Sequence, residues 1–479
     1  RVRAEGHKCW LVVSAVTTVT NFLIRAMADA LESTENTGNY EEFESSSFTE
    51  IVKLHRHLWS SLEFSFDDEA FTTLSKLFAD LKRLLFGIAL CGEASPRMRA
   101  KVTSFGELMS SFIGLHILSR AGLGVPTKRV DARKCLIARS GAVINPEDVY
   151  LSACVDPSYD PDIIRRVVGE EIGCVITQGF IGSTLEGDTC LLGRGGSDTS
   201  AALFSALIGA ARCEIWTDVH GLFTSDPRHV KGTRLIKGTT YRVAQELASM
   251  GAKVLHPRCI VPAAWGKIPI EIHNTEDPNG PCTAITAPPV TKDLAGTASP
   301  RVLAVTCRNG QGLVHIDSVD MWGESGFLAK VFQPFREMDV SVDLVATSQY
   351  AVSLTLDHIP GGFEGSAFTR VISLLKRMGS VRTRYPCSVV SIVGEHLRSA
   401  LPEIGSALRA LENHGVHLMT QSCEDLNMSF VVDEDVAKEM VANLHEQFFR
   451  ASQGGEGDDV MGQTWEQLKN ERPTPPSLR

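Results

Sequence analysis

The 479-residue sequence lacks a long apolar run, a paired-cysteine motif and an excess of positive charge. Its longest apolar stretch, Trp10 to Ile24, is interrupted by serine, threonine and asparagine, so it does not predict a membrane span. The twelve cysteines include no Cys-x-x-Cys pair, which argues against a zinc site or a disulfide framework. A net charge of −10 disfavours nucleic acid and acidic membranes as partners, because both would repel the protein. We therefore expect a cytoplasmic protein that acts on a small molecule and holds no structural metal.

Two common phosphate-binding loops are also missing. Neither Gly-x-x-x-x-Gly-Lys-Ser/Thr nor Gly-x-Gly-x-x-Gly occurs in a suitable place. In their place, an apolar run from Val175 ends at Gly179, and a glycine-rich turn at residues 193–196 precedes a small-residue helix predicted over Thr199–Ala211. Such a strand, turn and helix bring backbone N–H groups and a helix N-terminus to an anion. This stretch therefore predicts a cradle for a phosphate or a carboxylate.

Side chains around this turn suit the same purpose. Arg194 can form a bidentate contact with a carboxylate, and Ser197 and Asp198 lie where the N-cap of the helix is expected. Taken alone, Gly-Gly-Ser-Asp leaves open a plain strand-turn-helix with a Ser/Asp cap.

Three segments together carry a family resemblance. Gly193-Arg194-Gly195-Gly196-Ser197-Asp198, Trp216-Thr217-Asp218-Val219 and Asp226-Pro227-Arg228 closely resemble the aspartokinases, and the resemblance extends from Leu11 to about Phe449. It implies an α/β fold: a three-layer α/β/α amino-acid-kinase sandwich with a mostly parallel sheet, followed by two ferredoxin-like (βαββαβ) ACT domains. It also implies ATP-dependent phosphorylation of the β-carboxylate of L-aspartate, the first step toward lysine, methionine and threonine.

The resemblance assigns residues to each substrate. Those implied for the amino acid are Thr20, Glu107, Phe180, Arg194 and Ser197. Among them Glu107 would hold the α-ammonium group and Arg194 a carboxylate. Those implied for ATP are Thr217, Asp218, Phe223, Arg228 and Lys253, with Phe223 in place of a tyrosine that is usual near the adenine.

The chemistry implied for the site is simple. A β-carboxylate with a pKa of about 3.9 is already ionised at neutral pH, so no general base is needed to deprotonate it. Catalysis then rests on positioning and on neutralising phosphate charge, with Arg194, Ser197, Asp198 and a Mg²⁺ ion at the reacting group.

One part of the family pattern is absent. Aspartokinases begin with a strand carrying Lys-Phe-Gly-Gly-Thr-Ser, which holds the β- and γ-phosphates, and nothing before Trp10 resembles it. The simplest explanation for the missing strand is that this sequence is a fragment. A genuine start at Arg1 would instead predict little kinase activity.

The second half of the chain changes pattern from Val302 onward, to short strands and helices in the order β-α-β-β-α-β followed by a second, incomplete pass. The strand Val302–Cys307 is left over upstream, so we expect it to complete the second unit. The predicted parts are a catalytic domain over 1–290, one ACT domain over 313–386, a second ACT domain from 302–308 and 387–450, and a flexible tail or linker over 451–479.

The resemblance also implies regulation by lysine. The residues that match the family's effector site are Met321, Phe327, Leu328, Ser341, Val342, Asp343, Ser348 and Gln349. Gln349 replaces a glutamate that helps to bind the effector's amine, so we expect weaker lysine binding or altered specificity. Pairing of ACT domains would make a homodimer, and an ACT pair that serves only dimerisation stays an alternative.

Two rival functions remain open at this point. Another amino-acid kinase, such as a glutamate or acetylglutamate kinase, is disfavoured by the ACT pair and by Ser104-Phe105-Gly106-Glu107. A non-catalytic amino-acid-binding regulator would suit the missing first strand.

Overall fold

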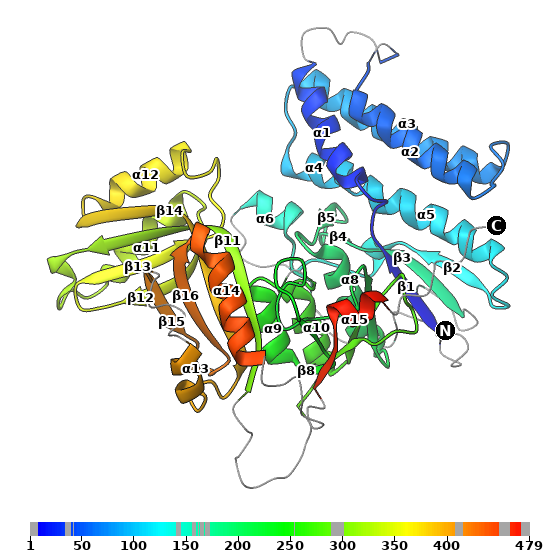
Figure 1. Ribbon diagram of the computed structural model, residues 1–479. Helices are drawn as coiled ribbons and strands as arrows, with labels where there is room; N and C mark the ends of the chain where they lie inside the picture. Colours follow the sequence, from blue (N-terminus) through cyan, green and yellow to red (C-terminus); the bar gives the residue numbers. More distant parts are fainter. Residues whose placement is uncertain are drawn as a thin grey trace. The chain divides into compact units, whose positions relative to one another are not determined.

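The computed structural model describes residues 8–33, 40–41, 43–139, 145–155, 160, 162, 167, 173–252, 254–288, 301–407, 415–449 and 460–470. The chain, drawn in Figure 1, divides into two compact units. One comprises residues 1–215 and 258–270, and the other comprises residues 216–257 and 271–479. This division differs from the boundary expected near residue 290, because residues 216–257 group with the second half of the chain.

The first unit is built on a small parallel sheet. Its strands β1 (Cys9–Val13), β3 (Cys174–Gln178) and β2 (Thr127–Val130) lie in the order β1-β3-β2. Val13 pairs with Gln178, so the carboxyl ends of β1 and β3 meet at one edge. All five residues of β3 are buried, as expected for a strand in a covered parallel sheet.

Helices form a second core in this unit (Figure 1). In the long helix α3 (Glu69–Cys91) the buried residues Leu74, Phe78, Leu81, Leu85 and Ile88 recur every three or four positions and line one face. Asp68 caps the start of α3, and a left-handed Gly92 ends it. The other elements of the unit are α1 (Val19–Glu32), α2 (Ser46–Ser61), α4 (Pro96–Thr103), α5 (Phe105–Arg120), η1 (Ala132–Lys134), α6 (Pro146–Leu151), β4 (Ile181–Ser183), β5 (Thr189–Leu191), α8 (Gly196–Ile208) and α10 (Pro257–Gly266).

A four-stranded sheet has the order β6-β9-β10-β8, and the division between the units passes through its strands β6 and β9. Thr283, at the start of β10, is fully buried; its hydroxyl donates to the carbonyl of Ile236 and accepts from the N–H of Leu222. The elements are β6 (Cys213–Thr217), β7 (Arg234–Ile236), β8 (Gly238–Thr240), α9 (Tyr241–Ser249), β9 (Ile270–Asn274) and β10 (Thr283–Thr286).

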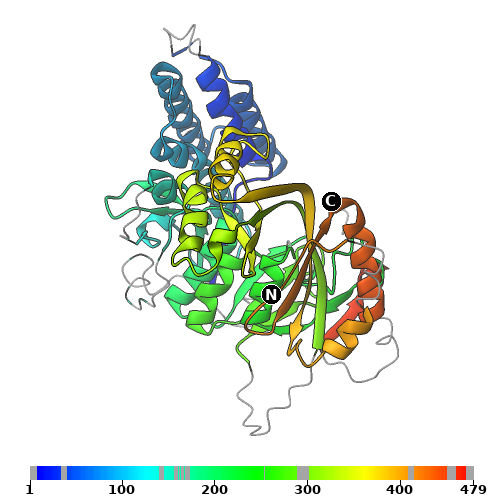
Figure 2. The ribbon, with the colours of Figure 1, turned by 90° about the vertical axis from the view of Figure 1, so that its left-hand side faces the viewer.

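The rest of the second unit is a six-stranded antiparallel sheet with the order β12-β13-β11-β14-β16-β15. Strands β11 and β14 are long enough to run through both halves of this sheet, and Val302 at the start of β11 pairs with Gly394 near the end of β14. Helices α11 and α12 contact each other beside one half (Figure 2). The elements are β11 (Arg301–Asp317), η3 (Val319–Met321), α11 (Phe327–Glu337), β12 (Val342–Thr347), β13 (Ala351–Leu356), α12 (Ser366–Leu375), β14 (Ser380–Glu395), α13 (Leu401–Ala407), β15 (Leu418–Gln421), β16 (Asn427–Asp433) and α14 (Glu434–Phe449).

The C-terminal segment corrects one expectation. The flexible tail predicted over 451–479 is wrong for residues 460–470, which form β17 (Met461–Thr464) and α15 (Trp465–Asn470). Strand β17 pairs antiparallel with β7, and Leu468 is buried against Phe223 and Leu235. The segment is ordered because it covers the edge of β7 and buries apolar side chains there.

Among the described residues, none of the helices is long and apolar enough to cross a membrane.

Candidate active site

Glu107 lies in the first turn of α5, where it faces the segment that follows β1. Gly106 makes this approach possible, because a Cβ atom there would lie 2.8 Å from the Cβ of Ala15. The N–H of Ala15 donates to Oε1 of Glu107 at 3.3 Å. The side chain is 2 % exposed, and its Oε2 has no hydrogen-bond partner among the described residues. Burial raises the pKa of Glu107 to about 7. A buried carboxylate with a free oxygen is suited to bind an ammonium group.

Thr20 belongs to the same neighbourhood along the chain. It lies in the first turn of α1, just after the β1–α1 connection that contains Ala15. The helix begins after Thr18, which takes a left-handed conformation with a φ of 70°. The connection after β1 therefore carries both Thr20 and the backbone donor to Glu107.

The glycine-rich turn places the start of α8 at the edge where β1 and β3 end. Gly193 and Gly195 have positive φ values of 76° and 63°, which glycine adopts at little cost. Helix α8 begins at Gly196 with Gly195 as its N-cap, so the expected N-cap role of Ser197 and Asp198 is wrong. Both residues lie in the first helical turn instead, because the left-handed glycine lets the helix begin sooner.

Phe180 fixes the distance between β3 and this helix. Its φ is 63°, which is uncommon for a bulky residue, and its N–H donates to Oγ of Ser200 at 2.9 Å. A Cβ atom at Gly196 would lie 2.4 Å from the Phe180 ring, and one at Gly179 would lie 2.7 Å from Oγ of Ser197. The two glycines thus allow Ser197 to sit against the end of β3, while Arg194 stays exposed in the turn.

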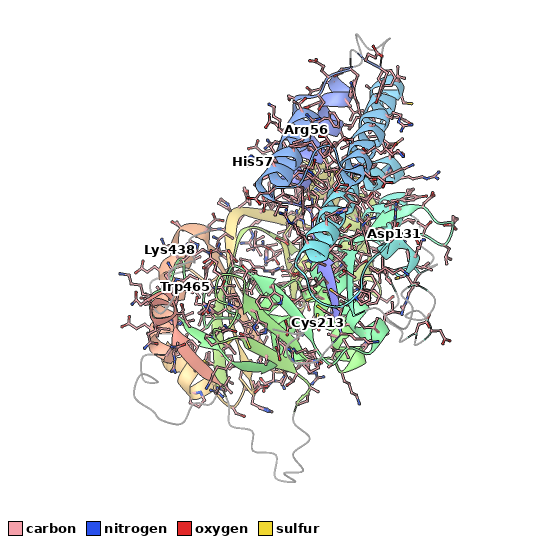
Figure 3. All side chains as sticks on the ribbon, turned by 90° about the vertical axis from the view of Figure 1, so that its right-hand side faces the viewer. Arg56, His57, Asp131, Cys213, Lys438 and Trp465 are labelled. Atoms are coloured by element: carbon pink, nitrogen blue, oxygen red, sulfur yellow. The ribbon has the colours of Figure 1, made fainter. Side chains whose placement is uncertain are left out.

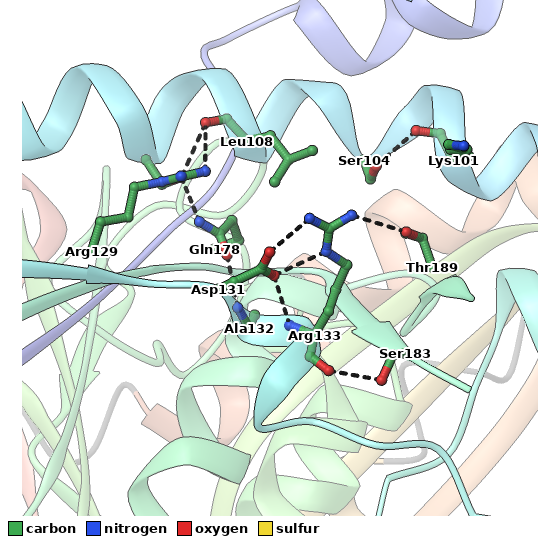
Figure 4. Close-up of polar contacts among 11 residues, drawn as sticks. Lys101, Ser104, Leu108, Arg129, Asp131, Ala132, Arg133, Gln178, Ser183 and Thr189 are labelled. Carbon is green, nitrogen blue, oxygen red and sulfur yellow. Dashed lines mark hydrogen bonds and ion pairs between the residues drawn. The ribbon is translucent and has the colours of Figure 1, made fainter. Parts of the chain in front are cut away.

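A buried polar network holds the end of β3 in place (Figure 4). The Gln178 amide donates to Oγ of Ser111 at 2.7 Å and accepts from the N–H of Ala132 at 2.8 Å. Arg129 also donates to Ser111, which lies one helical turn after Glu107. The network therefore ties the strand that leads to Phe180 to the helix that carries Glu107.

Asp131 and Arg133 stabilise the adjoining turn. Asp131 accepts from the N–H of Arg133 at 3.0 Å and from its guanidinium at 2.9 and 2.7 Å. Hydrogen bonds and charge from Arg133 outweigh burial and lower the pKa of Asp131. The carbonyl of Arg133 accepts from Ser183, so this pair supports the β4–β5 hairpin.

The second unit contains a cavity of about 650 Å³. Four of the five residues that match the family's ATP site line it: Thr217, Asp218, Phe223 and Arg228. Ala252 and Val254 also line it, whereas Lys253 between them lies outside the described residues. The Arg228 guanidinium is exposed and paired with Asp226 at 2.9 and 2.7 Å, and that pairing raises the pKa of Arg228.

Several residues that line this cavity could not be predicted from the sequence. They come from β11, α14 and the C-terminal segment, and include Thr306, Cys307, Glu434, Lys438 and Trp465. Figure 3 labels Lys438 and Trp465 on the same side of the molecule. A lysine on an amphipathic helix and a tryptophan in a polar tail carry no local motif, so only the tertiary packing reveals their place.

Residues expected to bind an effector lie at both ends of β12, since Val342 at its start pairs with Leu356 and Thr347 at its end pairs with Val352. Phe327 is buried in the core of the first half of the six-stranded sheet, so its side chain packs there and only its backbone is left to meet a ligand. Met321 and Val342 lie partly buried against the same core, while Leu328 and Ser341 are exposed.

Polar groups complete that region. Asp343 forms an ion pair with Arg308 of β11. Ser348 accepts from the N–H of Ala351 at 3.1 Å in the β12–β13 turn, where Gln349 is exposed.

Glu271, His273 and Cys282 place ligand atoms within 4.8 Å of one another. Nε2 of His273 lies 3.0 Å from Glu271, and its ring stacks on Trp216 with centroids 4.9 Å apart. These two contacts hold the imidazole in place.

Comparisons with known proteins identify the family. The model of the amino acid kinase family matches residues 1–274, and aspartokinase 1 of Arabidopsis thaliana is 30% identical over 452 residues, which cover 92% of this chain and 75% of that protein. The chain belongs to the aspartokinases of the amino acid kinase family. The lysine-sensitive aspartokinase 3 of Escherichia coli K12 is 29% identical over 459 residues, 94% of each chain.

Two solved structures of the E. coli enzyme extend the match. The aspartokinase III complex with aspartate and ADP has a TM-score of 0.75 at 28% identity and covers 92% of this chain and 93% of that one. The complex with lysine and aspartate has a TM-score of 0.69 and covers 92% of each. The predicted fold class, an amino-acid-kinase α/β fold followed by tandem ferredoxin-like units, is confirmed.

Proposed function

We propose that the protein transfers the γ-phosphoryl group of ATP to the β-carboxylate of L-aspartate and forms 4-phospho-L-aspartate, the first step toward lysine, methionine and threonine. The observation that carries this proposal is Glu107, a buried carboxylate with a free oxygen beside the carboxyl ends of β1 and β3. The relatives support it, since they are named aspartokinases and one solved relative holds aspartate and ADP.

The amino acid would be recognised at both of its charged ends. Glu107 binds the α-ammonium group, and the incoming cation lowers the pKa of this carboxyl from about 7, so that it is ionised when the substrate is bound. Arg194, exposed in the glycine turn, binds a carboxylate, and Thr20 and Phe180 line the site.

ATP would bind in the cavity of the second unit, whose volume of about 650 Å³ is within the range of small-molecule sites. Thr217, at the C-terminal end of β6, and Asp218 occupy the position at which open α/β sheets bind ligands. Arg228 contributes charge for the phosphates, and Lys253 is proposed for the same role.

The phosphoryl transfer requires no general base, because the β-carboxylate is ionised at neutral pH. The hydroxyl of Ser197 and the carboxylate of Asp198 are hard oxygen donors, which suit Mg²⁺. That ion supplies charge neutralisation on the phosphates. Backbone N–H groups at the start of α8 add positive potential at the reacting group.

Lysine feedback is proposed to act through the six-stranded sheet. Strand β11 carries Arg308, the partner of Asp343 in the expected effector site, and its neighbours Thr306 and Cys307 line the cavity proposed for ATP. An effector that moves Asp343 would therefore act on the same strand that forms a wall of the nucleotide site. Pairing of the ACT units in a homodimer is part of this proposal.

The proposal is tested by comparing substrates. Protein expressed from the complete coding sequence should release ADP from MgATP with L-aspartate, and much more slowly with L-glutamate or N-acetyl-L-glutamate. A preference for either of the latter would identify another amino-acid kinase. Amino-acid binding without ADP release would identify a regulator.

A further inference from the structure

We propose that Trp465 of the C-terminal segment contacts the base of a purine nucleotide bound in the cavity of the second unit. This inference rests on the proposed ATP site. It makes Met461–Asn470, which was expected to be a free tail, one wall of that site.

The segment is held firmly enough to serve as a wall. The N–H of Lys237 donates to the carbonyl of Val460 at 2.7 Å, and Arg234 donates to the carbonyl of Gly462 at 3.0 Å. The N–H of Trp465 itself donates to the carbonyl of Thr233 at 2.9 Å. These bonds anchor the segment on both sides of β7.

The start of α15 is fixed as well. The N–H of Thr464 donates to Oε1 of Gln467 at 2.8 Å, while Oγ1 of Thr464 accepts from the N–H of Gln467 at 3.2 Å. This reciprocal pair is a capping box, which sets where the helix begins. Trp465 is the first helical residue after it, so the cap sets the position of its backbone.

The indole is oriented by its packing. Its ring meets Phe223 edge-on, with centroids 5.3 Å apart and planes at 87°, and Nζ of Lys469 lies 5.1 Å from its centroid. Leu235 and Leu468 complete the cluster beneath it. The indole of Trp465, labelled in Figure 3, remains partly exposed and lines the cavity. Phe223 is buried and lines the same cavity.

The cavity therefore offers two kinds of surface. Arg228, which is paired with Asp226, and Lys438 supply positive charge, which suits phosphate oxygens, beside the carboxylates of Asp218, Glu276 and Glu434. The Phe223–Trp465 pair supplies aromatic surface, which suits a base. A ligand with both a polyphosphate and a purine matches this combination, whereas a polyphosphate alone uses only the cations.

The test is isothermal titration calorimetry of the full chain with MgADP and, separately, with magnesium tripolyphosphate. We expect Trp465→Ala to weaken MgADP binding about five- to thirtyfold, the loss typical of one aromatic contact with a base, and to leave tripolyphosphate binding within about twofold. Trp465→Phe keeps an aromatic ring against Phe223 and should stay within about threefold of the parent protein for MgADP. The matched control is Trp265→Ala, since Trp265 is 65% exposed and does not line the cavity.

The outcomes separate this inference from the proposed function. Equal MgADP affinity of the parent and Trp465→Ala would overturn the role of Trp465 and leave the kinase proposal standing. An equal loss for MgADP and tripolyphosphate would also overturn it, because the segment would then support the cavity without contacting the base. A parent protein that binds tripolyphosphate but not MgADP would overturn both.

Discussion

Glu107→Gln should make the free protein more stable while it weakens aspartate binding. The carboxyl has a pKa of about 7 when folded against an ordinary value of 4.5, and one pK unit corresponds to about 1.4 kcal/mol. At pH 8 the carboxyl is ionised in both states, so folding must bury its charge at a cost of up to about 3 kcal/mol. Glutamine removes that cost, and its amide oxygen can still accept from the N–H of Ala15.

The pH dependence follows from the same values. Below pH 4.5 the parent carboxyl is protonated in the folded and the unfolded states, so the two proteins should be equally stable. The advantage of Glu107→Gln should grow between pH 4.5 and about 7 and then stay constant. Urea unfolding of both proteins across this range measures the difference.

Kinetics supply the second half of this prediction. In the parent, kcat/KM for aspartate should rise through about pH 7 as Glu107 ionises, because the free enzyme must present a negative charge to the ammonium group. Glu107→Gln should lower this constant about ten- to a hundredfold and remove the rise, since it loses a charge-assisted contact. A variant that is no more stable at pH 8, with unchanged aspartate kinetics, would exclude a buried, substrate-binding carboxylate at Glu107.

Four further predictions have defined outcomes. Arg194→Ala should raise KM for aspartate by about ten- to a hundredfold through loss of a charge-assisted contact and leave MgADP affinity near that of the parent; an unchanged KM excludes its role. Arg228→Ala should raise KM for ATP more than KM for aspartate, whereas equal effects in steady-state assays would indicate a folding defect. In a lysine titration, Gln349→Glu should lower the inhibitory lysine concentration by about one to two decades, and Asp343→Ala should abolish the inhibition. If lysine inhibits neither the parent nor either variant, this effector site is excluded. Burial lowers the pKa of His445 to about 4, so the unfolding free energy should fall between pH 6.5 and 4 as the unfolded chain takes up the proton; His445→Gln should flatten that part of the profile.

The elements with a strong local pattern could be predicted from the sequence. The apolar run at Trp10–Val13 predicts a strand, and the pattern after Val302 predicts alternating strands and helices, as the structure has them. These predictions are possible because a buried strand is a short apolar run and a packed helix repeats its apolar residues every three or four positions. The turn around Arg194 was also found, since several glycines close together suit positive φ values.

Other features depend on partners that are distant in sequence. Strand β17 has four residues and includes Gly462, so nothing in its composition predicts a strand; its pairing with β7 makes it one. Phe327 was expected to meet an effector, whereas the apolar face of α11 places its ring in the core. The raised pKa of Glu107 required its burial, which a single helical sequence does not reveal.

The central claim is that this protein makes an acyl phosphate on aspartate. The most direct measurement is trapping with hydroxylamine, which converts an acyl phosphate to a hydroxamate, in protein expressed from the complete coding sequence. We expect aspartyl hydroxamate that requires both MgATP and L-aspartate and falls at least about tenfold in Arg194→Ala. Absence of hydroxamate from the parent protein, under conditions in which it binds both MgATP and aspartate, would exclude aspartate kinase activity.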